Sequence, residues 1–215
     1  SSAASDVYKR QVEDFKTQVD FAQGRQIHSV FIGGGTPSLI SALGYQWLFD
    51  QLKAVIPFAE GCEITLEANP GTVEHDPFAG YLQAGINRLS IGVQSFNTEH
   101  LKRLGRIHSN EDAISAIGLA REAGFQRINV DLMHGLPEQT LEQALHDLKL
   151  AVEQGATHIS WYQLTIEPNT VFFRTQPILP VDEVLEDIQE QGELYLKAQG
   201  FINYEVSAWR KELPS

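Results

Sequence analysis

The amino-acid sequence predicts an α/β fold, namely a whole or partial (β/α) barrel built on a parallel sheet. Short runs of β-branched and apolar residues alternate with amphipathic stretches along most of the 215-residue chain. A parallel strand pair needs a crossover connection, usually a helix, so this alternation indicates βα units. Several strand candidates are almost unbroken apolar runs, which is typical of a sheet covered by helices. Their spacing favours a barrel over a strictly alternating sandwich.

The strand and helix candidates follow one another in a regular order. Short apolar and β-branched runs predict strands over residues 27–32, 62–68, 87–94, 127–133, 158–164 and 202–206. Amphipathic spacing predicts helices over residues 42–56, 77–84, 99–104, 111–123, 141–154 and 181–198. The last of these has Leu185, Ile188 and Leu196 on its apolar side, and its acidic side is expected to be solvated.

The start of the chain differs from the rest. Residues 1–5 are mostly small and are expected to be disordered. The spacing of Val12, Phe15, Val19 and Ala22 predicts a helix that ends at Gly24. We therefore expect a disordered or non-native tail over residues 1–11 and a single core over residues 12–215.

Composition limits the classes of function. There are 28 acidic and 16 basic residues, and the resulting net charge of −12 argues against a nucleic-acid partner. One cysteine cannot form an intramolecular disulfide or hold an iron–sulfur cluster by itself. No apolar stretch approaches the roughly 20 residues of a membrane span, and a signal-peptide pattern is absent. These features predict a cytoplasmic protein without an integral membrane span.

A Gly-rich segment, Gly33-Gly34-Gly35-Thr36-Pro37, follows the first predicted strand. Glycines permit positive φ and let backbone N–H groups approach a ligand closely. A tight turn between strand and helix would use the same residues, so both interpretations stay open. The segment lacks the Gly-Lys-Ser/Thr of a phosphate-binding loop and the Gly-x-Gly-x-x-Gly spacing of a dinucleotide site.

Polar side chains recur where a barrel carries its functional face, at the carboxyl ends of the strands. Glu67, Gln94 and Asp131 lie at or near the ends of the second, third and fourth predicted strands. Singly, such residues are often caps or hydrogen-bond brackets. Together with the Gly-rich segment they offer carboxylates for a ribose or an ammonium group, and backbone amides for a carboxylate.

Three further residues are worth interpreting from the sequence. Arg106 is either a bidentate partner for a carboxylate or a solvated arginine at a helix end. Cys62 is predicted to be a buried small hydrophobe, and His134 a capping or packing residue. The residues alone thus indicate a small-molecule site at a barrel mouth, compatible with a metal-free lyase or isomerase and with a ligand-binding module.

The strand-end motifs, taken in order, resemble those of the radical S-adenosylmethionine (SAM) superfamily, and within it the HemN/HemW group of anaerobic coproporphyrinogen oxidase-like proteins. The matching segments are residues 29–39, 63–71, 85–96 and 129–137. The resemblance extends from about Val12 to Trp209. It implies a partial (β/α) barrel of the radical SAM type.

By this resemblance, one loop and four side chains bind SAM. Gly34, Gly35 and Thr36 match the loop that meets the methionine amino group. The positions that complete the SAM site are matched by Glu67, Gln94, Arg106 and Asp131.

The chain departs from the family pattern in one respect. The family's Cys-x-x-x-Cys-x-x-Cys loop, which holds a [4Fe–4S] cluster, has no counterpart among these residues. We therefore expect a fragment that lacks the first strand, the cluster loop and the C-terminal domain, and that does not cleave SAM by itself. No catalytic or metal-ligating residue is assigned, and the cluster's ligands are expected outside this chain.

Within the group, residues 67–71, 92–96 and 162–170 look more like HemW-type heme chaperones than HemN-type oxidases. The resemblance implies a protein that in complete form binds SAM and a [4Fe–4S] cluster and transfers heme to client hemoproteins, with an electron donor for the cluster. One alternative is an oxygen-independent coproporphyrinogen III oxidase, which converts propionates to vinyl groups with a 5′-deoxyadenosyl radical. A second alternative is a cluster-free module that binds SAM or a tetrapyrrole.

Overall fold

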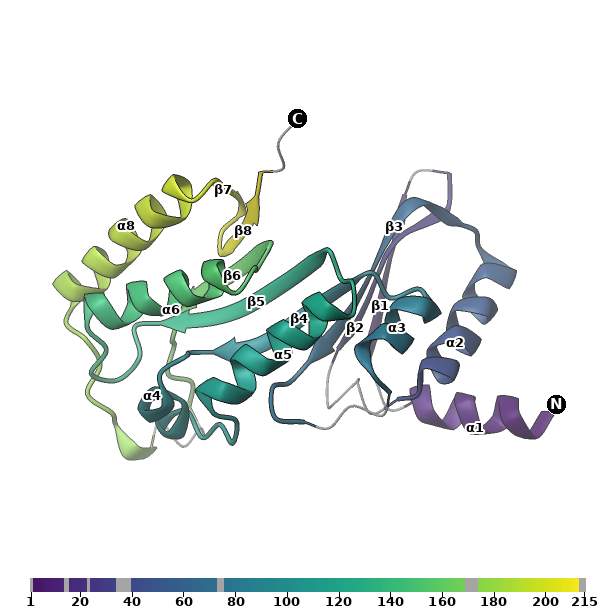
Figure 1. Ribbon diagram of the computed structural model, residues 1–215, viewed down its shortest axis with the longest axis horizontal. Coiled ribbons are helices and arrows are strands. Elements are labelled where there is room, and N and C mark those ends of the chain that lie inside the picture. Colours follow the sequence, from purple (N-terminus) through teal and green to yellow (C-terminus); the bar gives the residue numbers. More distant parts are fainter. Residues whose placement is uncertain are drawn as a thin grey trace. The chain divides into compact units, whose positions relative to one another are not determined.

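The structure, a computed structural model, describes residues 2–13, 16–22, 24–33, 40–72, 76–168 and 174–212. The chain forms two compact units. The first comprises Ser1–Ile91 with Ala116–Ile128, and the second comprises Gly92–Ser115 with Asn129–Ser215. Each unit is built from strands joined by helices (Figure 1).

The first unit contains the N-terminal helices and strands. Its elements are α1 (Ser2–Glu13), β1 (Lys16–Ala22), β2 (Gln26–Gly33), α2 (Ala42–Val55), β3 (Phe58–Ala68), α3 (Phe78–Ala84) and the start of β4 (Arg88–Gln94). The strand order is β1-β2-β3-β4, with β2, β3 and β4 parallel and β1 antiparallel to β2. Helix α2 lies beside both α1 and α3 (Figure 1).

Local chemistry explains where these helices begin and how they pack. Ser41 begins α2 because its hydroxyl accepts a hydrogen bond from Gly44 N–H at 2.9 Å. Buried Tyr45 and Phe49 of α2 stack on each other, and Tyr45 meets Tyr81 of α3 edge to face. The Tyr81 hydroxyl donates to the Ile40 carbonyl at 2.7 Å, so the buried phenol keeps a partner.

The predicted helix across Val12 and Ala22 is wrong in its second half. Residues 16–22 form β1 and pair with β2 along its whole length. The segment alternates polar and less polar residues with a period of two, and the ladder that it completes outweighs the apolar spacing used for the prediction. Ahead of it, α1 is helical where the sequence suggested a disordered start. Phe15 lies outside the described residues.

The second unit contains the rest of β4, α4 (Thr98–Arg103), β5 (Arg127–His134), α6 (Leu141–Glu153), β6 (His158–Gln163), α8 (Asp182–Ala198), β7 (Phe201–Glu205) and β8 (Ala208–Lys211). Helix α5 (Asn110–Glu122) and β5 contribute residues to both units. The strand order is β5-β6-β8-β7, with β5 and β6 parallel and β8 antiparallel to both of its neighbours. Strand β8 was not predicted.

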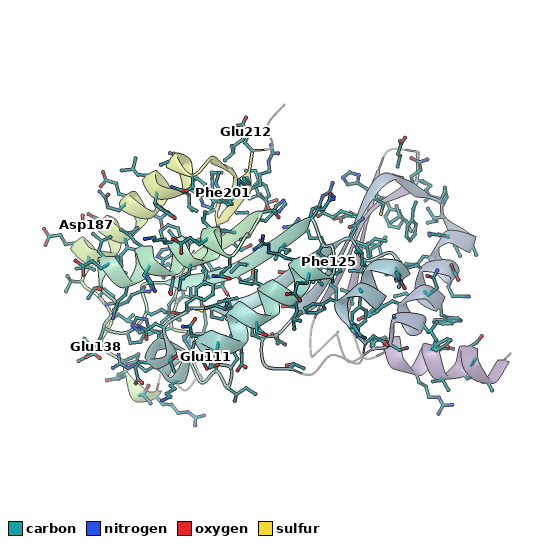
Figure 2. All side chains as sticks on the ribbon, viewed as in Figure 1. Glu111, Phe125, Glu138, Asp187, Phe201 and Glu212 are labelled. Carbon is teal, nitrogen blue, oxygen red and sulfur yellow. The ribbon has the colours of Figure 1, made fainter. Side chains whose placement is uncertain are left out.

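Helices α6 and α8 lie side by side in this unit (Figure 1). Thr140 and Gln143 form a capping box that begins α6. The acidic side of α8 is solvated, as predicted, and Asp187 projects outward from it (Figure 2). No helix in the described ranges is long and apolar enough to cross a membrane.

Strands β5 and β6 have one apolar face and one polar face, because successive side chains point to opposite sides of a strand. The apolar face is buried and includes Val130 and Leu132 of β5 and Trp161 of β6, which packs against α8. The opposite face carries the half-buried or polar side chains Asn129, Asp131, Met133, Ser160 and Tyr162. This face, which we call the polar face, is where the candidate site lies.

Candidate functional site

Gln94 is the last residue of β4 and has an unusual backbone conformation. Its φ is 68°, in the left-handed region, and its side chain is only 7% exposed. A residue other than glycine in this region costs roughly 1–2 kcal/mol, and such strain is kept where the surrounding structure holds it. The turn that follows is tight, since Ser95 N–H donates to the Val93 carbonyl at 2.8 Å.

The Gln94 side chain is oriented by Tyr162 of β6. The Tyr162 hydroxyl donates to Gln94 Oε1 at 2.6 Å, a short hydrogen bond. Because the carbonyl oxygen of the amide is engaged in this way, the NH₂ group is the part of Gln94 suited to donate to a ligand. The left-handed backbone of Gln94 and the hydrogen bond from Tyr162 together define the position of this amide.

Asp131 lies in the middle of β5, opposite Ser160 of β6 in the strand register. Its Oδ1 accepts a hydrogen bond from Asn129 Nδ2 at 2.8 Å, and Asn129 Oδ1 in turn accepts from Ser160 Oγ at 3.2 Å. These bonds orient the carboxylate on the polar face. An oriented, half-buried carboxylate is suited to accept from ribose hydroxyls or an ammonium group.

Arg106 lies in the link between α4 and α5 and is exposed. Its backbone N–H donates to the Leu101 carbonyl at 2.9 Å, and the next residue, Ile107, is 98% exposed. His108 then turns inward, with Nε2 2.9 Å from the Val93 carbonyl, and desolvation lowers the pKa of this imidazole. The link is thus fixed on both sides of Arg106, and the guanidinium reaches into solvent.

Glu67 belongs to the first unit and is the penultimate residue of β3. Its carboxylate lies against the backbone of Gly33 at the end of β2, where an added Cβ would be 2.6 Å from Glu67 Oε2. The same Cβ would be 2.6 Å from Cε1 of Phe31. Gly33 has no positive φ, so its missing Cβ leaves room for these two side-chain ends rather than serving turn geometry. Gly34, Gly35 and Thr36 lie outside the described residues.

Sequence reasoning singled out Gln94 and Asp131 but assigned no role to Tyr162, Asn129 or Ser160. The structure brings Gln94 and Tyr162 into direct contact and links Asp131 to Asn129 and Ser160. The signal for them was the period of two in β5 and β6, which places alternate residues on the face of Asp131.

The described residues do not fit an iron–sulfur cluster. Among them, no group of three or more His, Cys, Asp or Glu side chains is arranged to hold a metal ion. Cys62 is the chain's one cysteine, it is partly exposed rather than buried as predicted, and burial of its thiol raises its pKa. A [4Fe–4S] cluster needs several thiolates, so no step is assigned to one here. The polar face, in contrast, presents hydrogen-bonded polar side chains, among them Asp131 and Tyr162.

Comparison with known proteins identifies what the chain is similar to. The model of the radical SAM superfamily matches residues 2–151. The chain is 53% identical over 206 residues to the heme chaperone HemW of Escherichia coli, covering 96% of this chain and 54% of that protein. It is 54% identical over 198 residues to the heme chaperone HemW of Haemophilus influenzae, covering 92% and 52%. The chain spans about half the length of these curated relatives.

Among solved structures, the fold is similar to that of the coproporphyrinogen III oxidase HemN from Escherichia coli, described as a radical SAM enzyme. The TM-score is 0.75 at 30% identity, and the match covers 87% of this chain and 44% of the other. The similarity confirms the predicted α/β class and the partial barrel. Pairing is mixed rather than wholly parallel, because β1 is antiparallel to β2 and β8 is antiparallel to both β6 and β7.

Proposed function

Because the chain belongs to the radical SAM superfamily, we propose that the protein is a heme chaperone of the HemW type, which binds SAM and passes heme to client hemoproteins. The observation that carries this proposal is the 53% identity to a curated HemW across 96% of the chain. The family supplies SAM and a [4Fe–4S] cluster as cofactors. We also propose that the protein is located in the cytoplasm and that its partners include an electron donor for the cluster.

The proposed SAM-binding residues are described for each unit by itself. The family resemblance assigns Gly34, Gly35, Thr36, Glu67, Gln94, Arg106 and Asp131. The geometry within the second unit supports the assignment of Gln94 and Asp131, because both are held in place by their neighbours on the polar face. In the first unit, the Glu67 carboxylate lies beside Gly33 near the end of β3, which is where the resemblance assigns an acceptor.

Each side chain has a separate task in this proposal. Gln94 donates from its NH₂ group to the amino-acid end of SAM, and Arg106 pairs with the SAM carboxylate. Asp131 and Glu67 accept hydrogen bonds from the ribose or the amino group. When bound, SAM would supply the adenosyl group from which the radical of this superfamily is formed. These residues bind and orient the SAM molecule.

We expect Asp131→Ala and Arg106→Ala to weaken SAM binding by about 10- to 100-fold, since each removes a charged hydrogen-bonding partner worth roughly 1.5–3 kcal/mol. The measurement is isothermal titration calorimetry with SAM on the full-length, anaerobically reconstituted protein. Asp187→Ala, which removes an exposed carboxylate of α8, is the matched control and should bind SAM as the wild type does. Wild-type affinity in both site variants would remove these assignments.

The rival function is an oxygen-independent coproporphyrinogen III oxidase, which the structural similarity to HemN favours. We expect the full-length reconstituted protein to contain iron, to bind heme, and to leave coproporphyrinogen III unchanged in the presence of SAM and a reductant. Anaerobic incubation followed by chromatography of the porphyrins checks this result. Conversion of the propionates to vinyl groups would replace the chaperone by the oxidase, and a preparation without iron would favour a cluster-free module.

A further inference from the structure

The turn after Gln94 is held by a carboxylate that sequence analysis did not consider. Asp147 of α6 accepts a hydrogen bond from Ser95 Oγ at 2.8 Å and a second from Phe96 N–H at 2.9 Å. Each carboxylate oxygen takes one of these bonds, and the residue is 1% exposed. A bidentate acceptor of this kind fixes both the position and the orientation of the turn.

Ser95 extends the hold of Asp147 along the chain. The serine is fully buried, and its Oγ also accepts from Asn97 N–H at 3.0 Å. Asn97 in turn caps α4, because its side chain accepts from His100 N–H. One carboxylate on α6 therefore determines the path of the backbone from the end of β4 to the start of α4.

The strained residue stands directly before this turn. Gln94 has a left-handed backbone, and such a conformation persists only where neighbouring bonds fix it. If the turn relaxed, rotation about the Gln94 backbone would carry its amide away from the Tyr162 hydroxyl. The bonds to Asp147 resist this rotation together with the bond from Ser95 N–H to the Val93 carbonyl, since they hold the two residues that follow Gln94.

The burial of Asp147 is costly. Desolvation raises the pKa of this carboxyl to about 7, and it outweighs the two hydrogen bonds, which act in the opposite direction. An apolar residue of similar size on the buried side of α6 would avoid that cost. The carboxylate is therefore better explained by the geometry that it imposes than by the stability that it adds.

We propose that Asp147 is a positioning residue of the SAM site, which acts through Ser95 and Phe96 to hold Gln94 in the strained conformation that presents its amide on the polar face. Asp147 does not touch the ligand. The inference rests on the proposed function, because it gives Asp147 a role only if Gln94 binds SAM.

The test compares SAM affinities of variants of the full-length reconstituted protein. Asp147→Ala removes both acceptors and should weaken SAM binding about tenfold or more. Asp147→Asn should stay within about threefold of the wild type. Its amide oxygen can still accept from Phe96 N–H, and its NH₂ can donate to Ser95 Oγ, since a serine hydroxyl rotates to accept. Equal losses in the alanine and asparagine variants would overturn the proposal.

A double-mutant cycle with Gln94→Ala shows whether Asp147 acts through Gln94. We expect Asp147→Ala to cause little further loss of SAM affinity once Gln94 is alanine, because the position of the turn then no longer matters. Additive losses would contradict the inference. Wild-type affinity in Gln94→Ala alone would instead contradict the proposed SAM site, so the two failures are distinguishable.

Thr140→Ala is the control for general loosening of α6, because it removes the N-terminal cap of the same helix without touching the turn. It should lower the melting temperature while leaving SAM affinity at the wild-type value. If Thr140→Ala weakens SAM binding as much as Asp147→Ala, the effect of Asp147 is purely structural.

Should Asp147→Ala fail to fold, Ser95→Ala replaces it. This variant removes one of the two bonds to Asp147 and also the bond from Asn97 N–H to Ser95 Oγ, so it should weaken SAM binding about fivefold or more, whereas wild-type affinity would overturn the proposal.

Discussion

Gly192→Ala is expected to lower the free energy of unfolding by about 3 kcal/mol or more. Gly192 is a buried residue of α8, and a Cβ at this position would lie 2.1 Å from Cη2 of Trp161 and under 3 Å from two further ring atoms. The indole is 3% exposed and has the His134 ring 4.0 Å away, centroid to centroid. Since neither ring has free space, α8 must move away from β6 to accept one methyl group.

The measurement is urea unfolding of the full-length protein, followed by tryptophan fluorescence. Gly118→Ala on α5 is the matched control, because a Cβ there would meet nothing within 4 Å. In that helix the exchange should add about 0.5–1 kcal/mol, since alanine restricts the unfolded chain more than glycine does. An unfolding free energy of Gly192→Ala equal to or above that of the wild type would show that the helix is not seated on Trp161.

The positions of the parallel strands along the chain could be predicted from the sequence because each is an apolar run between helical patterns. The predicted end of β4 at Gln94 agrees with the structure, and β5 and β6 each differ by one residue at that end. The antiparallel strands β1 and β8 were missed. Their side chains do not form long apolar runs, and their hydrogen bonds depend on a neighbouring strand that periodicity does not reveal.

The site could be predicted only in part, for a similar reason. Gln94 and Asp131 attract notice because they interrupt or end apolar strands. Asp147 was not singled out from the sequence, although buried Ala144, Leu148 and Ala151 share its side of α6 at helical spacing. A carboxylate at such a position is a usable signal, since it must find partners when it is buried. Which partners it finds depends on the turn that β4 presents.

The pH dependence of stability should reveal His134 as a buried neutral imidazole. It is 1% exposed, and burial lowers its pKa from 6.5 to about 4. Between these values the unfolded chain binds a proton that the folded chain excludes, so the free energy of unfolding falls as the pH drops from 6.5 toward 4. The loss attributable to this residue is about 2 kcal/mol at pH 5 and about 3 kcal/mol at pH 4.

His134→Leu removes this titration while leaving an apolar side chain against Trp161. Its unfolding free energy, relative to the wild type, should rise by about 2 kcal/mol between pH 7.5 and pH 5 in urea titrations of the full-length protein.

The variant must be compared with the wild type at each pH because, in the opposite direction to His134, Asp147 changes the stability of both proteins with pH. Its raised pKa of about 7 makes wild-type stability fall as the pH rises from about 4 to 7. The unfolding free energy of Asp147→Asn, relative to the wild type, should therefore rise toward alkaline pH. That of His134→Leu should instead rise toward acid pH. Parallel profiles for His134→Leu and the wild type would mean that the imidazole is hydrated in the folded protein, and that the apolar face of β5 and β6 is open to water there.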